Sequence, residues 1–114
     1  MAKEKKLQVY VFVNSWKDRH GDEGNAVKVF ATKKKADEFL ADDVENYLID
    51  HDAIDDDNNI DTSCLESFDA GDIHTDECTV VNFLKQAKKS GDVEINVDGD
   101  GTYASWSVKK QTVD

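Results

Sequence analysis

An alternation of apolar and polar side chains early in the chain predicts a pair of β-strands. In residues 7–14 aliphatic side chains fall at every second position, and Tyr10 and Phe12 fill positions between them. Both faces of this strand are therefore apolar, which predicts that other structure flanks both. Residues 26–31 alternate again, and the polar segment 16–25, with its two glycines, predicts a hairpin connection.

Apolar side chains at three- and four-residue spacing follow and predict an amphipathic helix. Thr32 is a favourable N-cap, and the helical spacing continues to about His51. The apolar stripe consists of Ala36, Phe39, Leu40, Val44, Tyr47 and Leu48. Asp43 falls within this arc, where it marks either a break in the helix or a small error in the assigned face. The opposite side of the helical wheel carries four acids: Glu38, Asp42, Glu45 and Asp52.

The segment from Ala53 to His74 has weak periodicity. A stretch of this length without regular structure is uncommon in a compact domain. We therefore expect a short helix over residues 62–68, capped by Asp61 or Thr62. Thr75 is expected to cap a second helix that ends at Gly91. The buried stripe expected for that helix is Val80, Phe83, Leu84 and Ala87.

The chain ends on a second predicted hairpin. Residues 93–97 and 104–108 alternate, and Asp98-Gly99-Asp100-Gly101 supplies the turn between them. The order hairpin, helices, hairpin predicts an α+β fold of two layers. Its expected form is a single domain, residues 1–114, in which a four-stranded antiparallel sheet carries helices on one face in the order ββα(α)αββ.

Charge is divided unevenly along the chain. The 49 residues from Ala36 to Leu84 contain 16 of the 25 acids and no lysine or arginine. The remaining segments hold all 14 basic residues, so the formal net charge of −11 comes from an anionic middle between mildly cationic ends. A field of this kind repels phosphates and attracts cations or basic protein surfaces.

Composition argues against several classes of protein. Direct binding of nucleic acid is not expected, because the chain is acidic and has a single arginine, the residue favoured for forked phosphate contacts. No membrane partner is expected, since no apolar run approaches the roughly 18 residues of a span. The lysine-rich start precedes an apolar piece too short for a signal peptide. We therefore expect a cytoplasmic protein whose Cys64 and Cys78 are reduced thiols.

The signals for catalysis and for zinc are weak. No histidine lies in a recognisable nucleophile motif and no glycine-rich phosphate loop is present, so neither enzyme activity nor a cofactor is expected. Cys64, His74 and Cys78, with His51 as a fourth residue, have the side chains that zinc binds. Their spacing lacks the close pairs of structural zinc sites. Zinc is therefore not assigned to them.

The segment from Asp55 to Glu66 leaves one alternative function open, a module that binds a divalent cation such as calcium. Five residues occupy loop positions one, three, five, seven and twelve of a calcium-binding helix–loop–helix: Asp55, Asp57, Asn59, Asp61 and Glu66. Position six is Ile60, where that loop needs a glycine with positive φ. A solvated acidic loop is therefore favoured over a calcium site.

The acids of the first helix and of the segment after it form the candidate partner-binding surface. Its residues are Glu38, Asp42, Glu45, Asp52, Asp55, Asp56, Asp57 and Asp61. A dense row of carboxylates imitates the DNA backbone, which carries one charge per roughly 1.7 Å of duplex axis. We therefore expect a non-enzymatic protein that binds a basic protein partner, in particular a nucleic-acid-binding protein. The remaining alternative is a soluble domain whose acids serve only solvation.

In composition the chain resembles the DNA-mimic inhibitors that phages and mobile elements carry, among them anti-CRISPR and anti-restriction proteins. The likeness lies in small size, acidity and the α+β character of a single domain. No motif carries it, and those inhibitors share no common fold. The resemblance implies inhibition of a nuclease or another nucleic-acid-binding host protein, and it transfers no functional residue to this chain.

Overall fold

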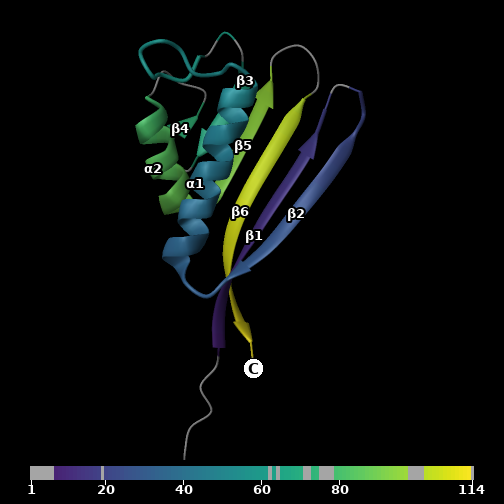
Figure 1. Ribbon diagram of the computed structural model, residues 1–114, viewed down its shortest axis with the longest axis vertical. Helices are drawn as coiled ribbons and strands as arrows, with labels where there is room; N and C mark the ends of the chain where they lie inside the picture. The colour runs from purple at the N-terminus through teal and green to yellow at the C-terminus, as the bar shows by residue number, and fades with distance from the viewer. Residues whose placement is uncertain are drawn as a thin grey trace, which may run out of the picture.

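The computed structural model describes residues 7–18, 20–61, 63, 65–70, 73–74, 79–97 and 102–113. Within these residues, the side chains of Glu66, Ile73, His74 and Val113 are not described. The described residues form one antiparallel sheet and two α-helices (Figure 1). In chain order the elements are β1 (Leu7–Lys17), β2 (Glu23–Phe30), α1 (Lys33–Asp50), β3 (Leu65–Ala70), β4 (Ile73–His74), α2 (Val80–Ser90), β5 (Asp92–Val97) and β6 (Tyr103–Val113).

The strands lie in the order β2-β1-β6-β5-β3-β4, and all neighbours are antiparallel. β1 and β6 pair along their whole length, from Leu7 opposite Val113 to Lys17 opposite Tyr103. This pairing joins the first and last strands of the described chain in the interior of the sheet. β2 forms one edge of the sheet, and the two-residue β4 forms the other.

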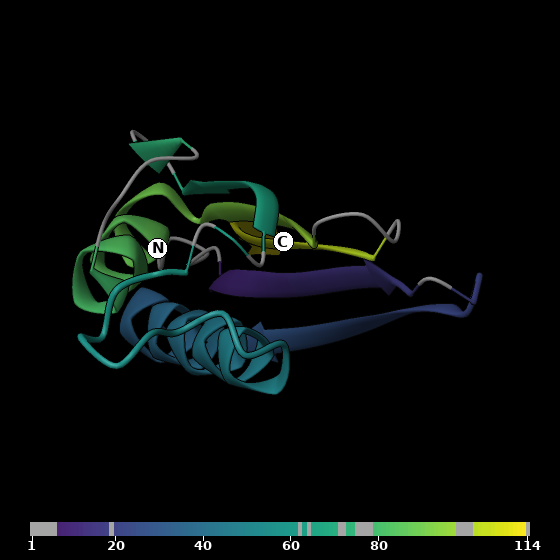
Figure 2. The ribbon, with the colours of Figure 1, turned by 90° about the horizontal axis from the view of Figure 1, so that it is seen from above.

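Both helices cover the same face of the sheet, and the sheet curls around them (Figures 1 and 2). Side chains alternate along a strand, so each strand contributes every second residue to the core. On the side of α1, the ring of Phe12 packs edge-on against Phe39 at 4.8 Å between centroids. Trp106 of β6 packs edge-on against Tyr47 at 5.1 Å.

The helix α2 completes the core over β3 and β5. Phe83 meets Phe68 of β3 edge-on, with 5.4 Å between ring centroids. The two helices run antiparallel, because the Nζ of Lys33 at the start of α1 donates to the backbone carbonyl of Lys88 near the end of α2. The fully buried side chains of the core include Phe12, Leu40, Val44, Leu48, Phe68, Val80, Phe83, Val93 and Ile95.

Asp43 lies on the buried side of α1 without breaking the helix. Its Oδ2 accepts a hydrogen bond of 2.8 Å from the indole Nε1–H of Trp106, whose side chain is buried. The carboxylate thus satisfies a polar group that the core would otherwise leave without a partner. Of the two explanations for an acid within the apolar arc, a helix break is therefore wrong.

The predicted helix over residues 62–68 is also wrong, because β3 occupies residues 65–70. Leu65 and Phe68 are both buried although they lie three residues apart, a spacing typical of a helix. Between Leu65 and Ser67 the pairing of β3 with β5 shifts register. Such an irregularity brings residues three apart to the same face and imitates helical spacing. The extra strands β3 and β4 also overturn the expectation of a four-stranded sheet.

The second helix begins later than expected. Its N-cap is Thr79, whose hydroxyl accepts a hydrogen bond from the backbone N–H of Asn82 at 3.1 Å, so the choice of Thr75 is wrong. Residues 75–78 lie outside the described residues. The predicted end at Gly91 is confirmed. Gly91 has a left-handed backbone with φ of 72°, and an added Cβ would lie 2.9 Å from the carbonyl oxygen of Val108.

The first hairpin is longer than its sequence pattern indicates, since β1 continues to Lys17 and β2 begins at Glu23. Trp16 lies opposite Gly24 in the ladder. A Cβ at Gly24 would lie only 2.6 Å from the indole ring of Trp16, so the glycine provides the space for this ring. The turn is held by Asp18, whose Oδ1 accepts hydrogen bonds from the backbone N–H groups of His20 and Asp22.

The expectation that structure covers both faces of the first strand is wrong within the described residues. Phe12 is buried beneath the helices, but Val9, Val11 and Val13 point to the other face and remain partly exposed. An apolar pattern on both sides of a strand is typical of sheets with helices on each face. Here both helices lie on a single face of the sheet.

We predict that Asp43→Ala lowers the free energy of unfolding by about 1–3 kcal/mol, because the indole N–H of Trp106 then lacks an acceptor in the core. Urea denaturation followed by tryptophan fluorescence measures this loss. Asp43→Asn is the matched control, since its amide oxygen still accepts the bond, and we expect less than half of the loss. An unchanged unfolding free energy in the alanine variant would contradict the role assigned to this bond.

Candidate protein-binding surface

The outer face of α1 carries a row of acids, which we call the acidic stripe: Glu38, Asp42 and Glu45. They lie opposite the buried residues of the helix, which include Leu40, Val44 and Leu48. Glu38 and Asp42 are exposed and Glu45 is half-buried. Spacings of four and three residues place the three side chains one above the other on the same helix face. The predicted helix and the positions of these three acids on its outer face are thus confirmed. Asp52, the fourth acid of the predicted face, lies beyond the end of α1 at Asp50.

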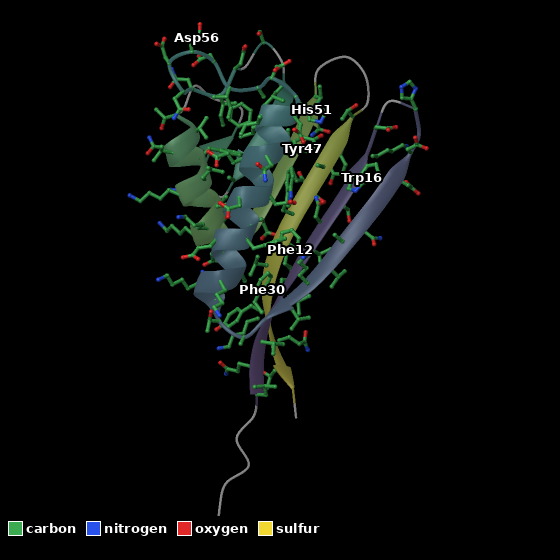
Figure 3. All side chains as sticks on the ribbon, in the orientation of Figure 1. Phe12, Trp16, Phe30, Tyr47, His51 and Asp56 are labelled. Atoms are coloured by element: carbon green, nitrogen blue, oxygen red, sulfur yellow. The ribbon has the colours of Figure 1, made fainter. Side chains whose placement is uncertain are left out.

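Residues 51–61, which we call the acidic loop, follow directly at the end of α1. Asp52, Asp55, Asp56 and Asp57 are exposed, and Asp61 is half-buried. The loop crosses to the start of α2, where the N–H of Val80 donates to the carbonyl of Asn58 at 3.0 Å. It therefore covers the end of the molecule at which α1 finishes and α2 begins (Figure 1). Figure 3 shows Asp56 at this outer end. It lies beyond Tyr47, which is in the last turn of α1, and beyond His51, which follows that turn.

Two carboxylates of the acidic loop hold its backbone. The Oδ1 of Asp55 accepts hydrogen bonds from the N–H groups of Asp57 and Asn59, at 3.0 and 2.9 Å. The Oδ1 of Asp61 accepts from both the N–H and the hydroxyl of Ser63. These two acids therefore have a structural role, whereas Asp56 and Asp57 present their carboxylates at the surface.

The end of α1 places an aspartate where helices favour glycine. The N–H of Ala53 donates to the carbonyl of Leu48, and the N–H of Asp52 donates to the carbonyl of Ile49. This pair of bonds is a Schellman motif, which needs a left-handed residue at the position of Asp52. Asp52 has a φ of 53° accordingly. Aspartate is one of the few residues other than glycine that adopt this backbone, but the negative end of the helix dipole does not favour its carboxylate.

The charges of α1 oppose its dipole at the other end as well. Lys33, Lys34 and Lys35 occupy the first turn, which contains no acid, and the last turn contains no base. Each adverse charge costs a few tenths of a kcal/mol. By contrast α2 carries Lys88 and Lys89 in its last turn, where the dipole favours them. The helix dipole therefore does not explain why the lysines of α1 stand in its first turn.

Whereas Lys85 lies in the middle of α2, the lysines of α1, with Lys88 and Lys89 of α2, gather at the end opposite the acidic loop. The start of α1 and the end of α2 adjoin there, and Lys33 forms a salt bridge with the buried Asp37. With 18 residues, α1 separates the two ends by about 27 Å. Charges at the surface are screened over about 8 Å at physiological ionic strength. Lys34, one turn before Glu38, acts on the near end of the stripe, but these lysines do not neutralise the acidic loop.

One residue of this surface was not found by sequence reasoning. Ile49 is 55% exposed and lies one turn beyond Glu45 on the same face of α1. Its position outside the apolar stripe of the helix could have identified Ile49 as an exposed residue from the sequence. The stripe thus ends in an exposed aliphatic side chain beside the acidic loop.

The geometry of the acidic loop differs from that of a calcium-binding helix–loop–helix. Ile54 and Ile60 form an antiparallel bridge, and Ile60 is buried. The positive φ falls at Asn58, not at Ile60, and the next element is β3 instead of a helix. Among the described residues no group of three or more His, Cys, Asp or Glu side chains is arranged to hold a metal. The side chain of Glu66 lies outside the described residues.

The four residues considered for zinc are largely outside the described part of the chain. Cys64 and Cys78 are not described, and only the backbone of His74 is described. The ring of His51 packs against Tyr47 at 4.3 Å between centroids.

Comparison of the chain with protein-family models, with curated proteins and with solved structures finds no match. Neither helix of the described chain combines the length and the apolar character needed to cross a bilayer.

We predict that Asp52→Gly is more stable than Asp52→Ala by about 1 kcal/mol. Both variants lose the carboxylate and its contacts, so their difference isolates the left-handed backbone at this position. Thermal or urea unfolding of the two variants, compared directly, measures it. Equal stability of the pair would show that the helix end relaxes away from the Schellman geometry.

We predict that calcium does not bind specifically to the acidic loop, because Asp55 uses its Oδ1 for backbone N–H groups. Isothermal titration calorimetry with calcium chloride in about 150 mM salt should show no saturable heat. Thermal unfolding should be unchanged by the same addition. Saturable binding with a dissociation constant below about 0.1 mM would contradict this prediction and restore the cation-binding alternative.

Proposed function

We propose that this protein is a non-enzymatic acidic interaction protein that binds a basic surface of a nucleic-acid-binding protein. The contact surface is the acidic stripe together with the exposed acids of the acidic loop. One observation carries the proposal: acids occupy one helix face and the adjoining loop, and the lysines of α1 and α2 other than Lys85 gather at the other end. The position of Asp52 at the negative end of the α1 dipole supports it, since the dipole does not favour an acid there.

The spacing of the stripe indicates which feature of nucleic acid it imitates. From Glu38 to Glu45 the three carboxylates extend over about 10 Å of helix axis, or one charge per roughly 5 Å. A single DNA strand carries one phosphate per roughly 3.4 Å, and the duplex one per roughly 1.7 Å. The stripe is therefore closer in density to one strand than to a duplex. It suits a groove that holds a short stretch of one phosphate backbone.

Ile49 gives this surface an apolar contact at its centre, between the acidic stripe and the acidic loop. Interfaces between proteins commonly combine an apolar core with a polar rim. Binding therefore combines long-range attraction by the carboxylates with burial of this side chain.

Inhibition of a nuclease follows if the basic groove is one that normally binds DNA. Occupation of the groove by the acidic surface excludes the substrate, and no catalytic residue of this chain takes part. This proposal makes the protein a DNA mimic of the kind that phages and mobile elements use against host defence. Composition and surface charge support this finer assignment.

We predict that the protein slows DNA cleavage by at least one member of a panel of nucleases with basic clefts, including restriction and CRISPR enzymes. The inhibition constant should rise at least tenfold, roughly, between 50 and 500 mM salt, because opposite charges attract less strongly under screening. Cleavage rates at increasing inhibitor concentration measure this constant. A panel that is wholly uninhibited at the lower salt concentration would contradict the proposal.

Two variants of equal net charge separate a specific surface from general acidity. The first removes four acids of the proposed surface through Asp42→Asn, Glu45→Gln, Asp56→Asn and Asp57→Asn. The control removes four acids elsewhere through Asp22→Asn, Glu23→Gln, Asp92→Asn and Glu94→Gln. We expect inhibition to weaken about tenfold or more in the first and about twofold or less in the control. Equal losses in both would mean that no particular surface is used.

A further inference from the structure

The face of the sheet opposite the helices carries a second surface, which the proposed function does not use. Five valines of β1 and β2 point to this face, and we call them the valine patch: Val9, Val11, Val13, Val27 and Val29. Val11 lies opposite Val29 in the ladder, and Val13 lies opposite Val27. Val27 and Val29 are each 61% exposed, although valine is normally buried.

The valine patch is almost free of charge. The neighbouring strand β6 places Ser107, Lys109 and Gln111 beside Val13, Val11 and Val9. Three acids of this face, Asp69, Asp92 and Glu94, lie further away on β3 and β5. A fourth, Glu23, lies at the hairpin end of β2, opposite Lys17. Contiguous apolar surface of this kind on a folded chain marks an interaction site.

We infer that the valine patch is the interface of a homodimer, in which the same face of a second copy covers it. Each copy has a formal net charge of −11, so two copies repel each other at most orientations. The acidic stripe lies on the helix layer, on the other side of the sheet (Figure 2). Contact through the valine patches therefore turns the two stripes outwards, away from each other.

Charge also determines how the second copy is oriented. A two-fold axis across the strands would place the β5 and β3 acids of one copy opposite those of the other, where like charges repel. A two-fold axis parallel to the strands places β1 and β2 over β2 and β1 of the second copy. The acid-bearing strands then extend on opposite sides of the contact. The dimer is thus a sandwich of two hairpins whose sheets pack about 10 Å apart.

The size of the patch indicates a weak dimer. The paired face of β1 and β2, which holds most of the valine patch and the polar pairs Ser15–Asn25 and Lys17–Glu23, is about 25 Å long and about 12 Å wide. Two such faces bury about 600 Å² in total if they are flat, and up to about 1,000 Å² because side chains make the surface uneven, which is at or below the lower limit for specific interfaces. An interface of this size is typical of weak, transient association.

Salt distinguishes this inference from the proposed function. Screening weakens the repulsion between two copies of the same acidic chain, so self-association should strengthen as salt is added. Binding of a basic partner should weaken over the same range. Failure of one property therefore leaves the other unaffected.

Analytical ultracentrifugation of the full chain tests the inference at concentrations from about 1 to 200 µM, in about 50 and 500 mM sodium chloride. We expect a monomer–dimer equilibrium that is tighter at the higher salt concentration. A chain that remains monomeric at the highest protein and salt concentrations overturns the inference.

Val29→Lys should weaken the dimer at least tenfold, roughly, because each copy then brings a charge into the apolar contact. Ala26→Lys is the matched control, since it adds the same charge to the same strand but on the helix side. We expect it to dimerise like the unmodified chain, and circular dichroism should show that both variants are folded. If the dimer survives Val29→Lys, or if both variants abolish it equally, the valine patch is not the interface. The two copies would then pair through the edge of β2.

Discussion

The alternation of side chains in the central strands determines how the rest of the molecule is arranged. Phe12 and Trp106, on neighbouring strands, point to the same face and form the floor on which α1 packs. Asp43 satisfies the indole of Trp106 from the helix side. Because both helices lie on this face, the opposite face of β1 and β2 has no cover among the described residues. The buried core and the uncovered face thus both follow from the position of the two helices on one face of the sheet.

This arrangement gives the chain two surfaces of different character on opposite sides. The helix layer carries the acidic stripe and leads into the acidic loop, and the open face of the sheet carries the valine patch. Attraction of a basic partner and association of two copies therefore do not compete for the same residues. In a dimer formed through the valines, two acidic stripes face outwards, so one dimer presents two sites to a basic partner.

The sequence predicts most of the elements, and the failures have physical causes. The helix α1 and the two hairpins follow from regular spacing of apolar residues. β3 was missed because the register shift near Ser67 lets Leu65 and Phe68 share a face at helical spacing. The acidic stripe was predictable from the helical wheel. The structural use of Asp55 and the left-handed backbone of Asp52 were not, since both depend on how the loop closes.

The central claim is that the acidic stripe and acidic loop form one surface for a basic protein. Amide chemical shifts of the isotope-labelled chain, followed by NMR as a nuclease from the inhibited set is added, test it most directly. The account predicts shift changes and line broadening that begin along α1 and continue through residues 51–61, with β2 unaffected. Changes concentrated on β2, or at the lysine-bearing ends of the helices, would contradict it.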